Sequence, residues 1–257
     1  MFFLFFSLVL CSNHVLLLST SRSWLNFRHF FNVKLVHDYA VDHAFLSTHI
    51  TVAVADEYFF NPRHIKPVNS YFKIDHSGDS VTLDLFDSLL DTFVSSYTNS
   101  SLLLYLTGHG GNEFLKFQDH NHLSSSRFAN TVTRLLDRKV FSHVLIVLDT
   151  CQASTLFSKL DKSLPNLSWI ASSSINEDSI STEYDSTMGV FLQDRFTSEF
   201  IKLLRKRPNT LISDIPKLLS RRLIGSTVVV HYSKDFVLNK FFSYLLSLKI
   251  QFSHIHR

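Results

Sequence analysis

Cysteine is nearly absent from this sequence, and its scarcity limits the kinds of protein the chain can be. Only two of the 257 residues are cysteines, Cys11 and Cys151. Two cysteines do not make the disulfide framework of a small secreted scaffold, and Cys11 lies in a segment that a signal peptidase could remove. One thiol, Cys151, therefore remains in the body of the chain, where it is either inert core filler or a nucleophile.

The sequence also lacks long apolar runs and a strong excess of one charge. No segment reaches the about 18 uncharged apolar residues that a membrane-spanning helix needs, and lysines bracket the nearest candidate, 241–248. The formal net charge is only +3, and no long basic run favours nucleic acid as a partner. The basic clusters at 205–207 and 221–222 fit solvated helix ends better than a site for phosphate or anionic lipid.

The N-terminus carries a short apolar stretch, MFFLFFSLVLC, over residues 1–11. It has the length of the hydrophobic region of a signal peptide, although no basic segment precedes it. It is too short to span a bilayer as a helix. We predict a signal segment over 1–11, with a buried first strand as the alternative, and a single domain over 12–257, which shows no repeat or linker.

Apolar runs alternate with amphipathic segments along the chain, as in a parallel sheet covered by helices on both faces. Short apolar runs predict buried strands at 14–20, 49–55, 102–107, 144–148 and 167–171, with a closing strand at 227–231. Apolar spacings of three and four predict helices at 28–46, 81–94, 124–136, 153–160 and 190–206, with caps at Thr82 and at a serine of 124–126. The predicted fold class is α/β, with a mostly parallel sheet of about six strands.

Two of the predicted strands lead into reactive side chains. The run at 102–107 is followed by His109 between glycines, and the run at 144–148 is followed by Cys151. Ligands of open α/β sheets bind beyond the carboxyl ends of the strands, so we expect both side chains at one edge, within reach of each other. The imidazole can take the thiol proton and later return it to a leaving amine.

The residues around this pair favour nucleophilic chemistry. A helix beginning just after Cys151 would supply the positive end of its dipole to the thiolate. The amide hydrogens of Gly110, Gly111 and Cys151 could form an oxyanion hole, worth about 3 kcal/mol per donor in known cases. His109 precedes Cys151, which is the order found in caspases and the opposite of papain-like enzymes.

Several segments resemble one family in colinear order. They are TSRSWLNFRH at 20–29, ADEYFFNPR at 55–63, YLTGHGGNEFLKFQD at 105–119, LDTCQA at 148–153, EDS at 177–179 and GVFLQDRFT at 189–197. These segments resemble the catalytic subunits of glycosylphosphatidylinositol (GPI) transamidases, which are legumain-like cysteine peptidases of the caspase fold. The resemblance implies a three-layer α/β/α caspase-like catalytic domain.

Carried over to matching positions, the resemblance implies four catalytic roles. Cys151 would be the nucleophile and His109 the base. Asn26 would orient this dyad, and Gly110 would lie at the oxyanion site.

The resemblance to legumain also implies a pocket for the residue whose carbonyl is attacked. Arg28, Ser179 and Asp194 would line it, and Asp149 takes the place of an acidic residue two before the legumain nucleophile. Arg28 and Asp194 could equally form a structural ion pair.

The activity implied by the family is a transamidation in the lumen of the endoplasmic reticulum. The enzyme would release the C-terminal peptide of a proprotein, hold a thioester, and pass the acyl group to the amine of a GPI glycolipid. The chain would work with other subunits of a membrane complex and associate with the membrane through them. Because Phe60 stands where some relatives have a cysteine that bridges to a partner, we expect non-covalent contacts.

Two other functions remain open at this stage. A legumain-like endopeptidase would share the first half-reaction and use water as the acceptor. A non-catalytic scaffold subunit is less consistent with the sequence, because both His109 and Cys151 are present. We predict no cofactor and no catalytic metal, since the spacing of His120 and His122 fits no common zinc pattern.

Overall fold

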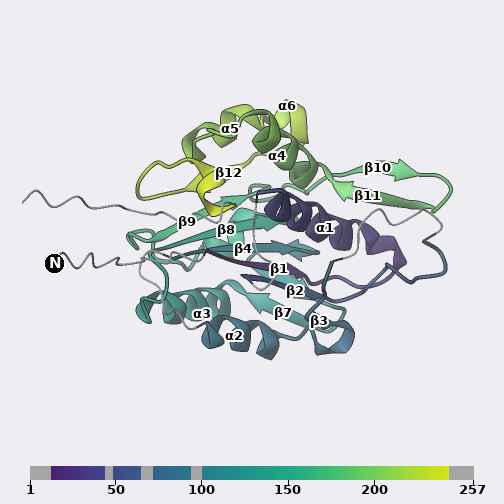
Figure 1. Ribbon diagram of the computed structural model, residues 1–257, viewed down its shortest axis with the longest axis horizontal. Helices are drawn as coiled ribbons and strands as arrows, with labels where there is room; N and C mark the ends of the chain where they lie inside the picture. The colour runs from purple at the N-terminus through teal and green to yellow at the C-terminus, as the bar shows by residue number, and fades with distance from the viewer. Residues whose placement is uncertain (1–12, 44–48, 65–71, 94–99, 243–257) are drawn as a thin grey trace, which may run out of the picture.

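The computed structural model describes residues 13–43, 49–64, 72–93 and 100–242. A central sheet lies between two layers of helices (Figure 1). One face carries α1 (Phe27–Asp42), α4 (Arg195–Lys206), α5 (Ile215–Leu218) and α6 (Arg221–Ile224), and the other carries α2 (Leu83–Thr92) and α3 (Ser125–Asp137). Separate clusters of buried apolar side chains fill the two interfaces between the sheet and the helices. The predicted signal segment, 1–11, lies outside the described residues.

The central sheet has seven strands in the order β12-β9-β8-β4-β1-β2-β3. Their bounds are β1 His14–Ser19, β2 Ile50–Val54, β3 His76–Ser77, β4 Ser101–Thr107, β8 His143–Asp149, β9 Leu167–Ala171 and β12 Val229–His231. Neighbouring strands are parallel except β12, which runs antiparallel to β9. The predicted mostly parallel sheet is confirmed, and each predicted strand is found within about two residues of its expected bounds.

The central strands are apolar between their end residues because helices cover both faces of the sheet. All seven residues of β4 are buried, as are the last six of β8. A strand that is buried on both faces has no polar side and therefore reads as a continuous run rather than an alternation. These two strands carry the catalytic candidates at their carboxyl ends.

The helices α1 (Phe27–Asp42), α2 (Leu83–Thr92) and α3 (Ser125–Asp137) fall near the predicted positions. Two of them begin at polar caps, as expected. The Thr82 hydroxyl accepts from the Leu85 amide, and the Ser124 hydroxyl accepts from the Arg127 amide.

Two predicted helices are wrong in part. Residues 190–206 contain a strand, β11 (Val190–Asp194), before α4 (Arg195–Lys206) begins, because β11 pairs with β10 (Ser181–Asp185) in a hairpin. Residues 153–160 form only a short 3₁₀ helix, η4 (Ala153–Phe157). The chain enters η4 through a left-handed Gln152, and tertiary pairing in both regions overrides the apolar spacing.

A second small sheet was not predicted from the sequence. The strands β5 (Gly110–Gly111), β6 (Phe114–Phe117) and β7 (Asn121–Ser124) form it just after His109. Its Lys116 amide donates to the His109 carbonyl at 2.8 Å, which helps to hold the histidine at the edge of the main sheet.

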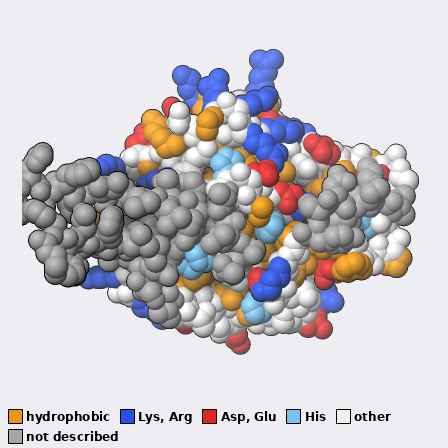
Figure 2. All heavy atoms as spheres, in the orientation of Figure 1, with side chains coloured by type: hydrophobic (Ala, Val, Ile, Leu, Met, Phe, Trp, Pro, Cys, Tyr) orange, Lys and Arg blue, Asp and Glu red, His pale blue; other side chains and the backbone are white. Residues whose placement is uncertain are grey.

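The basic clusters singled out in the sequence lie at exposed positions, with 205–207 at the end of α4 and 221–222 in α6 (Arg221–Ile224). Figure 2 shows Lys and Arg side chains projecting at the top of the molecule, where these helices lie. Arg205 pairs with Asp42 at 3.4 Å, and Arg221 pairs with Glu177 at 3.2 Å. These positions are consistent with solvated helix ends.

Candidate active site

The strand register brings the two reactive residues to the same edge of the sheet. In the parallel pair β4 and β8, Thr107 lies opposite Asp149. His109 and Cys151 each follow their strand by two residues, so both lie just beyond this edge. This is the arrangement that the sequence predicts.

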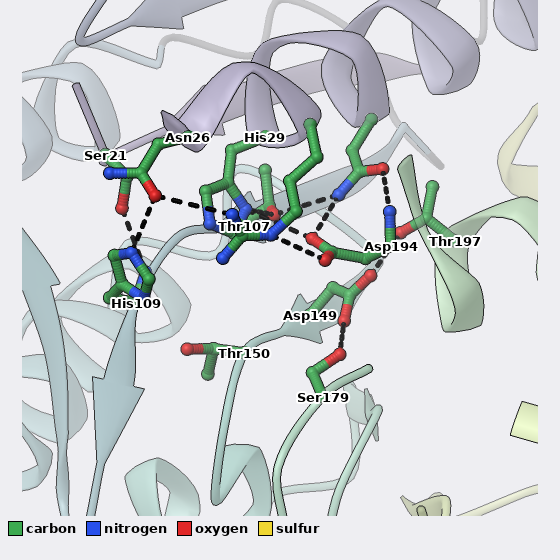
Figure 3. A network of polar contacts seen from close by, with 12 residues as sticks. Ser21, Asn26, His29, Thr107, His109, Asp149, Thr150, Ser179, Asp194 and Thr197 are labelled. Atoms are coloured by element: carbon green, nitrogen blue, oxygen red, sulfur yellow. Dashed lines mark hydrogen bonds and ion pairs between the residues drawn. The ribbon is translucent and has the colours of Figure 1, made fainter. Parts of the chain in front are cut away.

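The His109 side chain is held by Asn26, at the start of α1. The His109 Nε2 atom lies 2.8 Å from the Asn26 Oδ1 atom (Figure 3). The Asn26 amide nitrogen donates to the Arg22 carbonyl at 2.7 Å, which leaves Oδ1 as the acceptor. His109 therefore carries its proton on Nε2, and its Nδ1 has a free lone pair for use as a base.

Asn26 occupies the N-cap position of α1, yet its side chain makes no capping bond. An asparagine at this position normally accepts from a backbone amide of the first turn, which stabilises a helix by about 1 kcal/mol. Here the amide faces His109 instead. Asn26 thus contacts a residue 83 positions away in the sequence rather than the backbone of its own helix.

The environment keeps His109 neutral. Burial, together with the neighbouring His29, Arg28 and Lys116, lowers the pKa of His109 to about 4, although the charge of Asp194 acts in the opposite direction. The ring is therefore unprotonated at neutral pH, as a general base must be. The Ser21 hydroxyl also accepts from the His109 amide at 2.9 Å, which fixes the backbone at this point.

Gly110 brings the histidine segment against the nucleophile segment. A Cβ added at Gly110 would lie 2.4 Å from the Thr150 Oγ1 atom and 3.1 Å from the Cys151 carbonyl oxygen. Any larger residue would push the two segments apart. The glycine therefore has a steric reason to be there, and its oxyanion role stays a prediction.

The Cys151 thiol is half-buried and free. Burial raises its pKa, and the carboxylate of Asp178 adds to this, while the backbone amide of Ser179 acts in the opposite direction. The expected helix dipole is missing, because η4 is a short 3₁₀ element. The resting thiol is therefore protonated at neutral pH and depends on a base to become a nucleophile.

Serines that directly follow β9 hold the loop of the candidate nucleophile, residues 150–153, and were not predicted from the sequence. The Thr150 amide donates to the Ser172 hydroxyl at 3.2 Å, and the Ala153 amide donates to the Ser173 hydroxyl at 3.0 Å. The Ser173 hydroxyl in turn donates to the Thr150 carbonyl at 2.7 Å. The run of three serines at 172–174, directly after an apolar strand, is the sequence feature from which these contacts could have been predicted.

Asp149 and Ser179 lie together, as the predicted pocket requires. The carboxylate of Asp149 is buried and accepts from the hydroxyls of Ser179 and Thr197, each at 2.6 Å (Figure 3). Burial raises the pKa of Asp149 to about 7, and the nearby negative charge of Asp194 contributes. The group is thus partly protonated at neutral pH.

Arg28 and Asp194 form the ion pair that the sequence analysis left open as an alternative. Arg28 Nε donates to Asp194 Oδ1 at 3.0 Å, and Asn32 Nδ2 donates to Oδ2 at 2.6 Å. The pair is largely withdrawn from solvent, with 17% of the Arg28 side chain and 2% of the Asp194 side chain exposed. Burial opposes ionisation, but His29, Arg28 and Asn32 hold the Asp194 pKa below its ordinary value.

His29 links this ion pair to His109, and the sequence patterns did not single it out. Its Nδ1 atom lies 2.9 Å from the Thr107 hydroxyl and 3.1 Å from Asp194 Oδ2. Its ring packs edge to face against His109, with centroids 5.5 Å apart. Burial lowers the pKa of His29, although the neighbouring Asp194 acts in the opposite direction. Its place at the end of the family-like segment 20–29, next to Arg28, was the available hint.

No group of three or more His, Cys, Asp or Glu side chains within the described ranges is arranged to hold a metal ion. The chemistry available at this edge is that of a thiol, a neutral imidazole and backbone amides. Such a set performs acyl transfer through a covalent thioester.

Comparison with known proteins agrees with this chemistry. The chain is 30% identical to the GPI-anchor transamidase of Bos taurus over 84% of this chain and 61% of that protein. It is 32% identical to the GPI-anchor transamidase of Schizosaccharomyces pombe, again over 84% of this chain and 61% of that protein. A putative GPI-anchor transamidase of Drosophila melanogaster is 30% identical over 87% of this chain and 71% of its own length. The chain thus spans about three fifths of the cattle and fission yeast relatives.

The fold and the family are also matched directly. The structure of caspase-1 from Spodoptera frugiperda superimposes with a TM-score of 0.56 at 10% identity, covering 94% of each chain. This confirms the predicted three-layer caspase-like fold. The sequence profile of the peptidase C13 family matches residues 13–216. The chain therefore belongs to the peptidase C13 family.

Proposed function

We propose that this chain is the catalytic subunit of a GPI-anchor transamidase, with Cys151 as nucleophile and His109 as base. The observation that carries the proposal is the neutral His109, oriented by Asn26 and packed through Gly110 against the backbone of Cys151. The relatives named GPI-anchor transamidase support the choice of substrate.

In the first half-reaction, Nδ1 of His109 takes the thiol proton and Cys151 attacks the amide carbonyl at the attachment residue of a proprotein. The amide hydrogen of Gly110 would stabilise the oxyanion. His109 returns the proton to the leaving amine, so the C-terminal peptide departs and a thioester remains. In the second half-reaction the amine of a GPI glycolipid resolves this thioester.

The pocket for the attachment residue would be formed by Arg28, Asp149, Ser179 and Asp194. In the described structure these side chains hydrogen-bond to one another in two pairs, Asp149 with Ser179 and Asp194 with Arg28. Little polar capacity is left over for a long charged side chain. The proposed pocket therefore favours a small residue at the attachment site.

The proposed setting is the lumen of the endoplasmic reticulum, in a membrane-associated complex. None of the helices in the described part of the chain is long and apolar enough to cross a membrane. Phe60, which is 78% exposed, marks a place for non-covalent contact with a partner subunit. The proposed domain organisation is one catalytic domain over 12–257, preceded by a signal segment over 1–11.

Replacement of Cys151 by alanine in cells that depend on this gene tests the proposal. We expect surface proteins to lose their GPI anchors, with His109→Ala giving the same result. The control is Asp84→Asn, a change at an exposed position of α2 that should leave anchoring intact. Normal anchoring with Cys151→Ala would overturn the proposal.

Hydrolysis by a legumain-like endopeptidase is the second candidate, and membership of a peptidase family favours it. The two activities differ only in the acceptor. The purified protein is offered a proprotein and hydrazine, and the product is analysed by mass. A hydrazide supports the transamidase, whereas a product with only a free carboxylate supports the peptidase.

A further inference from the structure

The segment 177–179 runs alongside the nucleophile loop and is attached to it on both sides of Asp178. The Gln152 amide donates to the Glu177 carbonyl at 2.8 Å. The Ser179 hydroxyl donates to Asp149 Oδ1 at 2.6 Å. Asp178 is the residue between these two anchors, and it therefore lies beside Cys151.

Glu177 fixes this segment to the C-terminal part of the domain. Its Oε2 atom accepts from the amides of Ser174 at 3.1 Å and Thr227 at 2.7 Å. Its Oε1 atom accepts from the Thr227 hydroxyl at 2.9 Å and lies 3.2 Å from Arg221. With both carboxylate oxygens engaged, the backbone that carries Asp178 has a defined position. Arg221 and Thr227 follow the part of the chain that the family profile matches, 13–216.

The Asp178 side chain itself is exposed, and it takes part in no ion pair among the described residues. Its carboxylate is nevertheless close enough to the Cys151 thiol to hydrogen-bond with it and, together with burial, to raise the pKa of that thiol. A negative charge at this place opposes formation of the thiolate in the first half-reaction. The first half-reaction therefore gives no reason for an acidic residue here.

The second half-reaction does give such a reason. The acylated sulfur is uncharged, so the carboxylate no longer opposes a neighbouring charge. A primary amine reaches the site as an ammonium ion at neutral pH, and a carboxylate next to the sulfur attracts it. Water gains nothing comparable from the same charge.

We propose that Asp178 recognises the amine acceptor, drawing a primary ammonium group to the acyl-enzyme in preference to water. This inference rests on the proposed transamidase function. The ammonium hydrogen-bonds to the Asp178 carboxylate and loses one proton to the neutral His109. The nitrogen lone pair then forms the C–N bond as the C–S bond breaks, with that electron pair moving to sulfur. The second proton lost by the nitrogen protonates the thiolate, and His109 releases its proton to solvent.

The attraction can be measured without any substrate. In the full chain with Cys11→Ser, Cys151 is the only thiol. Its modification rates are compared for two methanethiosulfonates of similar size, one carrying a trimethylammonium group and one a sulfonate. Taking the ratio of the two rates removes any change in thiol pKa that both reagents share.

We expect Asp178→Asn to lower the ratio of the two modification rates, cationic reagent over anionic reagent, about fivefold to tenfold. Asp178→Glu should keep most of the ratio, and Asp84→Asn on α2, which removes the same charge elsewhere, should leave it unchanged. An unchanged ratio in Asp178→Asn would overturn the proposal. Melting temperatures are measured alongside, and we expect them to match the wild type because Asp178 is exposed.

The acceptor reaction provides the second test. The protein is acylated by a donor peptide and offered ethanolamine, which is an ammonium ion at neutral pH, or hydroxylamine, which is neutral. We expect Asp178→Asn to lose about fivefold of ethanolamine transfer relative to hydroxylamine transfer. If the wild type transfers both amines and the variant keeps their ratio, Asp178 is not the recognition residue. If the wild type only hydrolyses, the transamidase function itself fails, which is a different outcome.

Discussion

Two buried carboxylates of the site, Asp149 and Asp194, respond to the same burial in opposite ways. Asp149, on the nucleophile side, is bonded by neutral hydroxyls, and its pKa is raised to about 7 by burial and by the charge of Asp194. Asp194, on the base side, is bonded by Arg28 and Asn32 and lies beside His29, and its pKa is lowered although burial acts against this. The partners, rather than the burial, decide which carboxylate is charged.

The division has a physical advantage for the site. Two adjacent buried negative charges would repel each other strongly, and both would lower the tendency of Cys151 to form a thiolate. Keeping one charge paired with Arg28 and the other partly neutral avoids this. The arrangement is also the source of two contrasts that can be broken by substitution, and the close packing at Gly110 gives a third.

The largest expected effect is on stability, after removal of the charged partner. Asp194→Ala should lower the free energy of unfolding by about 3 to 5 kcal/mol, because it removes the buried carboxylate that Arg28 and Asn32 both contact. Asp149→Ala removes only acceptors of hydroxyl bonds and should cost about 1 to 3 kcal/mol. Urea unfolding at pH 7 measures both. Equal losses would contradict the assigned difference in charge.

The second contrast is the pH dependence of stability. Asp149 holds a proton in the folded chain at pH values where the unfolded chain has lost it, so its contribution is full below about pH 4 and is lost as the pH rises through about 7. Asp194 has the opposite sign, and its contribution is lost as the pH falls below the ordinary range of an aspartate.

The Asp149→Asn variant isolates the pH-dependent contribution of Asp149 to stability. We expect the stability of the wild type relative to this variant to fall by about 2 to 4 kcal/mol between pH 5 and pH 8, measured as the difference in urea unfolding free energy. The difference cancels the histidines that titrate in both proteins. A difference that rises with pH would show that Asp149 is charged in the folded chain.

The third prediction concerns the close approach between the segment of His109 and the segment of Cys151. Gly110→Ala should lower the rate of acylation of Cys151 by about a hundredfold, because the new methyl group would meet Thr150 and separate His109 from the thiol. Thr150→Ala in the same chain removes both Thr150 side-chain atoms that the methyl would meet and should restore part of the rate. No recovery in the double variant would indicate that Gly110 acts in another way.

Sequence patterns were sufficient to predict the central sheet and the edge of it at which His109 and Cys151 lie. The strands are apolar because both their faces are covered, so β1, β4 and β8 could be predicted from their runs alone. The equal offset of His109 and Cys151 from their strands then follows from parallel pairing.

The rest of the site could not be predicted from local patterns. Asn26 and Asp194 both occupy helix N-cap positions, but neither side chain caps its helix. Their partners lie 83 and 162 residues away, so capping preference gave no sign of them, and only the family resemblance did. The helix predicted after Cys151 failed for a related reason, since the loop follows bonds to serines of another strand.

The most direct test of this account is the pH dependence of Cys151 acylation by a donor peptide, followed by intact mass after rapid quenching. A neutral base whose pKa is lowered to about 4 predicts that the rate falls only as the pH approaches 4. The same curve is recorded for Asp149→Asn, which removes the titration of that carboxyl near pH 7. An acid limb near the ordinary histidine value of about 6.5 in both proteins would contradict the account.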